Sequence, residues 1–140
     1  MDTLRVGIIG IGNMGSNHAR ALLRGKVPGA VLSAVCDINP KRLAWAKEEL
    51  GEDIARFESA EQLFAADAVD GVIIATPHYD HPPLAVKAFN HNLHVLCEKP
   101  SGVYTRQVRE MNDAAAKSDK VFCLMFNQRQ NTLHQKARDL

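Results

Sequence analysis

The sequence predicts an α/β protein in which a doubly wound parallel sheet forms the middle of three layers. Short apolar runs rich in β-branched residues alternate with segments of about ten residues that show helical spacing of apolar side chains. Because a helix follows each predicted strand, the strands must run parallel, and helices must cover both faces of the sheet. In such sheets a ligand lies at the carboxyl ends of the strands, so the loops after the strands form the candidate site.

The first half of the chain is predicted to contain three strand–helix pairs. Its strands are predicted at 4–9 and 30–36, which are mainly apolar, and at the short segment 55–57. Its helices are 14–23, 40–50 and 59–65, the last capped by Ser59. The second helix begins with the N-cap Asn39 and the first-turn proline Pro40 and ends at Gly51. Trp45 is expected on the side of this helix that lies away from its apolar stripe.

The second half repeats this alternation without repeating the sequence. Strands are predicted at 69–76, 94–97 and 121–126. Helices are predicted at 82–89, 105–116 and 131–140. Pro77 ends the first of these strands, and Pro82 and Pro83 start the helix that follows, where a missing N–H group is harmless.

Composition excludes several classes of function. The 140 residues fit one domain, and a net charge of +1 from 17 basic and 16 acidic residues gives no footprint for nucleic acid or an anionic membrane. A small molecule is therefore the expected partner. The sequence shows neither a signal peptide nor a membrane span, which predicts a cytoplasmic location. Cys36, Cys97 and Cys123 lie in apolar runs without metal-ligand spacing and are predicted to be reduced core residues.

The glycine-rich turn after the first strand carries glycines at positions 10, 12 and 15. Gly10 suits the tight turn, Gly12 allows a pyrophosphate to approach, and Gly15 allows the helix to pack on the strand. The first helical turn directs free N–H groups towards an anion. Asp37 ends the second strand, where a carboxylate can accept hydrogen bonds from an adenosine ribose. A glycine bend without a ligand is the alternative, but the strand before it and the helix after it favour a dinucleotide site.

Three motifs together resemble the Gfo/Idh/MocA family of NAD(P)-dependent oxidoreductases. They are Gly10-Ile11-Gly12-Asn13-Met14-Gly15, Ala75-Thr76-Pro77-His78 with His81, and Glu98-Lys99-Pro100, in this order and at family-like spacing. The resemblance extends from Arg5 to Leu140. It implies a Rossmann-like fold and hydride transfer between a nicotinamide cofactor and a hydroxyl or keto group of a sugar, a cyclic polyol or a related compound.

The resemblance also implies which residues form the site. The cofactor-binding residues would be Gly10, Gly12, Asn13, Met14 and Gly15 at the pyrophosphate, Asp37 at the ribose, and Thr76, Pro77, His78, His81, Glu98, Lys99, Asn127 and Arg129 along the cleft. Lys99 would be catalytic, because an ammonium beside a substrate hydroxyl can stabilise an alkoxide or relay its proton. The alternative is that Glu98 and Lys99 are only solvated charges at the end of a strand.

Asp37 bears on the choice of cofactor. A carboxylate accepts from a free 2'-hydroxyl and repels a 2'-phosphate, so NAD is favoured and NADP remains possible, with Lys41 and Arg42 close by in the sequence. A metal is not expected, because His78 and His81 have no evident third ligand. His18, in the first helix, is expected to be structural or solvated.

Members of the resembled family usually continue into a second α/β domain that binds the substrate and often mediates oligomerisation. We therefore expect a dinucleotide-binding domain at residues 1–125 and, at residues 126–140, the start of a connection to a C-terminal domain that this sequence lacks. The 140-residue chain alone is expected to bind cofactor without turnover. The full-length protein is expected to be a homo-oligomer. A stand-alone module that senses or sequesters a dinucleotide is the alternative. Methyltransferases share the glycine loop and the acidic end of the second strand, but Glu98-Lys99-Pro100 argues against that class.

Overall fold

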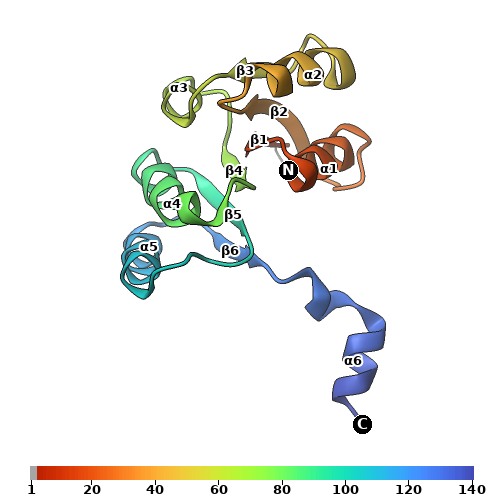
Figure 1. The fold of residues 1–140 in the computed structure, drawn as a ribbon, viewed down its shortest axis with the longest axis vertical. Coiled ribbons are helices and arrows are strands. Elements are labelled where there is room, and N and C mark those ends of the chain that lie inside the picture. The colour runs from red at the N-terminus through yellow and green to blue at the C-terminus, as the bar shows by residue number, and fades with distance from the viewer. Residues whose placement is uncertain (1–2) are drawn as a thin grey trace.

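A six-stranded parallel sheet forms the centre of the molecule (Figure 1). The computed structural model describes residues 3–140. The strands are β1 (Leu4–Ile9), β2 (Ala30–Cys36), β3 (Ala55–Phe57), β4 (Gly71–Ile74), β5 (His94–Glu98) and β6 (Phe122–Met125). They lie in the order β3-β2-β1-β4-β5-β6, and every neighbouring pair is parallel. Because β1 and β4 are adjacent in the middle, the strand order reverses there, which confirms the doubly wound fold.

The helices follow the predicted order closely. They are α1 (Asn13–Leu23), α2 (Pro40–Leu50), α3 (Ala60–Ala65), α4 (His81–Asn90), α5 (Thr105–Lys117) and α6 (Thr132–Arg138). The predicted caps are confirmed: Asn39 Oδ1 accepts from the N–H of Lys41 at 3.0 Å, and Ser59 Oγ accepts from the N–H of Gln62 at 3.2 Å. Two short 3-10 turns, His78–Asp80 and Asn127–Gln130, were not predicted, because single turns leave no periodic pattern in a sequence.

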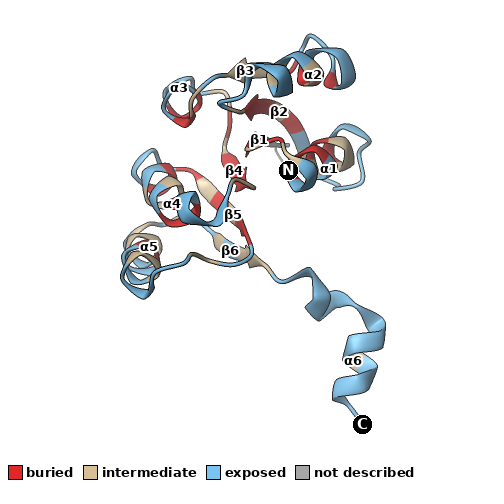
Figure 2. Cartoon of the chain, viewed as in Figure 1, coloured by how far each residue is buried: buried red, intermediate tan, exposed pale blue. Residues whose placement is uncertain are grey.

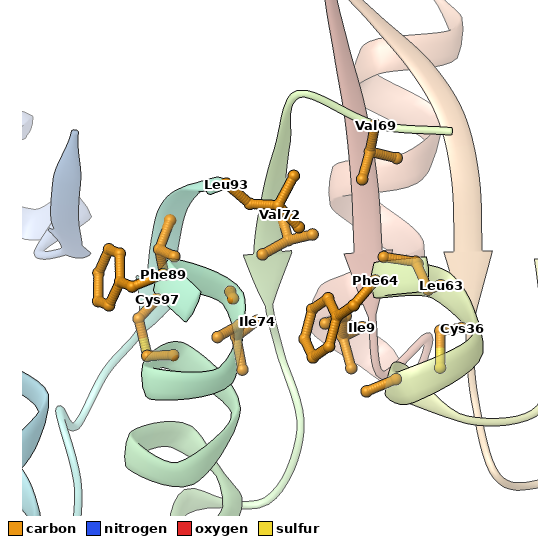
Figure 3. Packing of buried hydrophobic residues seen from close by; sticks show 14 of the residues in the cluster. Ile9, Cys36, Leu63, Phe64, Val69, Val72, Ile74, Phe89, Leu93 and Cys97 are labelled. Carbon is orange, nitrogen blue, oxygen red and sulfur yellow. The ribbon is translucent and has the colours of Figure 1, made fainter. Parts of the chain in front are cut away.

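Each face of the sheet carries its own apolar cluster. Ile8 belongs to the cluster under α1 and α2, whereas Ile9 belongs to the cluster under α3, α4 and α5, where it lies near Phe64 and Ile74 (Figure 3). Successive residues of a strand point to opposite faces, so a strand covered on both sides must be apolar at every position. This explains why residues 6–9 of β1 and the whole of β4 are continuous apolar runs rather than alternating ones, whereas Arg5, at the less buried start of β1, pairs with Asp70.

Trp45 does not lie where the helical pattern placed it. Its side chain is half-buried and packs against the cluster under α1 and α2, with the guanidinium carbon of Arg20 5.0 Å from the centre of its ring. The prediction was wrong because α1 packs beside α2. The side of α2 that carries Trp45 therefore also contacts another helix, although it lies outside the apolar stripe.

The face of the sheet that carries α1 is open over its second half. An apolar depression of about 530 Å³ lies there, lined by Val6, Ile73, Leu96 and Met125 among others. Cys123 also lines this depression and is exposed, unlike the buried Cys36 and Cys97. The prediction that all three cysteines are core residues is therefore wrong for Cys123.

The carboxyl-terminal helix lies apart from the sheet. α6 contributes no buried residue and extends away from the other elements (Figure 2). Within residues 3–140, no helix is both long enough and apolar enough to cross a membrane.

The burial of the cysteines predicts a difference in reactivity. Burial raises the pKa of Cys36 to about 12, with Asp37 adding to the effect, and burial with Glu98 likewise raises the pKa of Cys97 to about 12. Because the thiolate is the reactive form, we expect only Cys123 to react rapidly with Ellman's reagent in the native protein at pH 8. All three thiols should react in guanidinium chloride. Rapid reaction of a second thiol in the native protein would show that Cys36 or Cys97 is not buried as described.

Candidate functional site

The carboxyl ends of the central strands bring the predicted site residues to one edge of the sheet. Ile9 pairs with Cys36 on one side and with Ile74 on the other, and Ile74 pairs with Cys97. Each of these four residues is at or next to the last position of its strand, so the loops that follow begin side by side. The glycine turn, Asp37, Thr76 and Lys99 therefore share one edge, as the sequence predicted.

Two glycines of the turn are required by close approaches of the backbone. Gly10 has φ +85°, and a Cβ there would lie 2.9 Å from the carbonyl of Ala75. A Cβ on Gly15 would lie 1.9 Å from the carbonyl oxygen of Gly10, so α1 could not start where it does. Gly12 differs, because no heavy atom lies within 4 Å of the place where its Cβ would be. The space in front of Gly12 is thus open to a ligand.

The first turn of α1 has free donors at this opening. Gly12 is the N-cap and has no side chain to accept from the turn, and no acidic residue lies in the turn. Asn13 and Met14 are exposed there. Unpaired N–H groups and the positive end of the helix dipole favour an anion at this position.

Asp37 connects the glycine turn to the start of α2. Its Oδ2 accepts from the N–H of Ile11 at 2.9 Å, and its Oδ1 accepts from the N–H of Asn39 at 2.9 Å. The carboxylate therefore holds the turn in shape as well as providing charge at the edge. The sequence indicated only the second of these roles. Lys41 and Arg42 are exposed on the first turn of α2.

Thr76 and His81 lie at different depths in the loop after β4. Thr76 Oγ1 is buried and has no hydrogen-bond partner among the residues described. His81 is 0% exposed, and its ring nitrogens lie 2.9 Å from the carbonyl oxygen of Thr76 and 2.7 Å from that of Pro100. Pro77 and His78 are exposed above it. His81 therefore ties two loops together beneath the surface, and its side chain does not line the cleft.

Glu98 and Lys99 have opposite environments. Glu98 is 5% exposed, its Oε1 lies 2.8 Å from Nε2 of His18, and its Oε2 accepts from the N–H of Lys99 at 3.2 Å. The interpretation of Glu98 as a solvated charge is therefore wrong. The Lys99 side chain is exposed, and across residues 3–140 it makes no ion pair. The peptide bond between Lys99 and Pro100 is cis.

His18 is the site residue that sequence analysis did not select. It lies on α1 three positions after Gly15, and the expectation that it is structural agrees with its contact to Glu98. Because α1 starts at the edge where the strands end, the place of His18 on α1 indicated that a residue at the end of a neighbouring strand could contact it. No local pattern identified Glu98 as that partner.

Asn127 and Arg129 are less closely tied to this edge. Both lie in the exposed 3-10 turn after β6, and the guanidinium carbon of Arg129 is 4.9 Å from the centre of the Phe126 ring. No hydrogen bond between either residue and the glycine turn, Asp37 or Lys99 occurs in the described part of the chain.

The two histidines considered for a metal are not arranged as ligands. The rings of His78 and His81 are 5.8 Å apart at 67°, and both nitrogens of His81 face backbone carbonyls. Among residues 3–140 there is no group of three or more His, Cys, Asp or Glu side chains that could hold a metal ion.

The residues at this edge fit a dinucleotide. The open space before Gly12 and the free donors of α1 suit a diphosphate, and the buried, unpartnered Oγ1 of Thr76 provides a further polar group beside them. The exposed Lys99 ammonium lies at the same edge and can hydrogen-bond to a substrate oxygen. This set of groups favours binding of a phosphate-linked cofactor with proton transfer beside it.

Comparison with known proteins supports this description. The family model described as oxidoreductase family, NAD-binding Rossmann fold, matches residues 4–126. Inositol 2-dehydrogenase of Rubrobacter xylanophilus is 38% identical over 99 residues, which is 71% of this chain and 28% of that protein. Myo-inositol 2-dehydrogenase of Thermotoga maritima is 31% identical over 126 residues, which is 90% of this chain and 37% of that protein.

A solved structure shows the same architecture. Scyllo-inositol dehydrogenase from Lactobacillus casei with bound NAD(H) and scyllo-inositol has a TM-score of 0.91 and 30% identity. The similarity covers 99% of this chain and 41% of that one. The chain thus spans about a third of the length of the curated relatives it matches, between 28% and 37% for the two named above.

Proposed function

Because the chain belongs to the Gfo/Idh/MocA oxidoreductase family, whose matching region is an NAD-binding Rossmann domain, we propose that it forms the cofactor site of a polyol dehydrogenase. The observation that carries this proposal is the convergence of four loops at one edge of the sheet. A carboxylate after β2, an open diphosphate cradle after β1 and an exposed ammonium after β5 follow one another along that edge. NAD supplies the hydride acceptor when it is bound, and the protein supplies binding, orientation and a proton path.

We propose that the glycine turn and the first turn of α1 bind the pyrophosphate. Gly12 gives space, and the N–H groups of the turn, with Asn13 and Met14, donate to phosphate oxygens. Asp37 accepts from the adenosine ribose while its other contacts hold the turn. Thr76, Pro77 and His78 form the wall of the cleft, and Thr76 Oγ1 gains a partner there.

Lys99 is the proposed catalytic residue. Its ammonium is exposed and unpaired within the part of the chain that the structure describes, while the backbone on either side of it is held in place. An ammonium beside a substrate oxygen stabilises negative charge on that oxygen and can donate a proton to it, and the neutral amine form of the same side chain can accept the hydroxyl proton. Glu98 supports this position from below rather than contacting the cofactor itself.

We propose a boundary between the cofactor domain and the following segment near residue 125. The apolar clusters described above contain no residue after Met125, the family match ends at residue 126, and α6 has no buried residue. Asn127 and Arg129 lie in this segment and would approach the cleft only from its rim. The segment at 126–140 is accordingly assigned to the connection with a substrate-binding domain.

The relatives named as inositol dehydrogenases favour a cyclic polyol as the substrate of the whole protein. A secondary hydroxyl group on a ring suits transfer of one hydride to NAD and of one proton to the neutral amine form of Lys99, which becomes an ammonium. Homo-oligomerisation and a cytoplasmic location stay predictions.

Calorimetric titration of the 140-residue chain tests the proposal. We expect NAD and NADH to bind with a Kd on the order of 1 μM to 1 mM, the usual span of KM values for enzyme substrates. NADP should bind more weakly, because the Asp37 carboxylate repels a 2'-phosphate. S-adenosylmethionine should release no heat. If S-adenosylmethionine were the only one of these ligands to release heat, the proposed cofactor would be refuted. Steady NADH formation from myo-inositol by this chain alone would refute the proposal that a second domain is needed to bind the substrate.

A further inference from the structure

Two histidines from opposite halves of the fold hold the segment from Glu98 to Pro100. His18 comes from α1, which covers the first half of the sheet, and His81 begins α4, which covers the second half. We propose that His18 and His81 are positioning residues that together fix the backbone of Lys99 and so determine where its ammonium lies beside the nicotinamide. This inference rests on the proposed function and adds to it two residues that act through Lys99.

The first contact is a buried pair between α1 and β5. Nε2 of His18 lies 2.8 Å from Oε1 of Glu98, whose side chain is only 7% exposed, and the His18 side chain is 19% exposed. A carboxylate removed from water needs a hydrogen-bond donor, and His18 is the side chain that supplies one here. Because His18 and Gly15 lie on adjacent turns of the same helix, this pair also links Glu98 to the diphosphate cradle.

The second contact places both ring nitrogens of His81 against backbone carbonyls. Nδ1 lies 2.7 Å from the carbonyl oxygen of Pro100, and Nε2 lies 2.9 Å from that of Thr76. A carbonyl oxygen only accepts, so an N–H group of the ring is the donor. The buried ring therefore joins the loop after β4 to the turn after β5.

Lys99 lies between these two anchors. On one side Glu98 is held by His18 and accepts from the N–H of Lys99 at 3.2 Å, and on the other side His81 holds the carbonyl of Pro100. The Lys99 side chain is exposed and forms no ion pair with any residue in the range 3–140. Its position therefore depends on its backbone, which the two histidines control.

The test compares two ligands in the chain and its variants. NADH contacts the whole cleft, whereas ADP-ribose lacks nicotinamide and occupies only the cradle and the ribose site. We expect His18→Leu and His81→Leu to lower the ratio of NADH affinity to ADP-ribose affinity by roughly tenfold, the upper end of the effect of losing one hydrogen bond. His18→Gln and His81→Gln keep one donor and should lose less. His134→Gln, at an exposed histidine of α6, is the matched control and should leave the ratio unchanged.

The outcomes separate this inference from the proposed function. A wild-type chain that binds neither ligand would overturn both. Wild-type binding with equal losses for NADH and ADP-ribose in the folded variants would show a purely structural role and overturn the inference alone. If His18→Leu does not fold, His18→Gln and the double variant His18→Leu with Glu98→Gln, which removes the buried charge, provide the same comparison.

Discussion

NAD binding is expected to be lost, and the native state to be destabilised by about 3 kcal/mol, when Gly15 is replaced by alanine. The added Cβ would lie 1.9 Å from the carbonyl oxygen of Gly10, a distance that no side-chain rotation can relieve because both atoms are fixed by the backbone. The helix must move away from β1, and the cradle for the diphosphate moves with it. Urea unfolding measures the change in stability, and NADH titration measures the change in affinity.

Gly12→Ala is the matched control within the same turn. No heavy atom lies within 4 Å of its Cβ position, and its φ of −67° is accessible to alanine. We expect this variant to keep a melting temperature within about 2 °C of the wild type and still to lose roughly tenfold or more in NADH affinity, because the methyl group occupies the ligand's space. Equal loss of stability in the two variants would contradict the different roles assigned to these glycines.

Cofactor preference is expected to move towards NADP by about 100-fold when Asp37→Ser is combined with Ile38→Arg. The double change removes a carboxylate that repels a 2'-phosphate and adds a cation at a side chain that is 89% exposed and free to accommodate it. The ratio of the NAD and NADP dissociation constants, from calorimetry, gives the shift.

The same variant should also bind both cofactors somewhat more weakly. Asp37 accepts from the N–H groups of Ile11 and Asn39, and serine cannot replace both contacts. Asp37→Asn keeps the size of the side chain and removes its charge, so it separates the loss of repulsion from the loss of loop contacts. An unchanged ratio in the double variant would show that Asp37 does not face the ribose.

Local signals were sufficient for most of the fold. The apolar runs in β1 and β4, the cap residues Asn39 and Ser59, and the glycine turn each depend on neighbours close in the chain. Their patterns therefore predicted the elements, and the parallel order followed from strand–helix alternation. Trp45 and Cys123 were misplaced for the opposite reason. Whether a residue is covered depends on which helix, if any, packs over it, and no short pattern contains that information.

The sequence alone determined the parallel sheet, the loops that meet at its carboxyl edge, and the family, because these depend on short motifs and on the order of elements. Only the tertiary structure decided that Glu98 is buried against His18 and that His81 joins Thr76 to Pro100. Glu98 and His18 are separated by 80 positions. Contacts at such separations are set by how α1 and α4 pack on the two faces of the sheet, and a buried charge is stable only where that packing brings a partner to it.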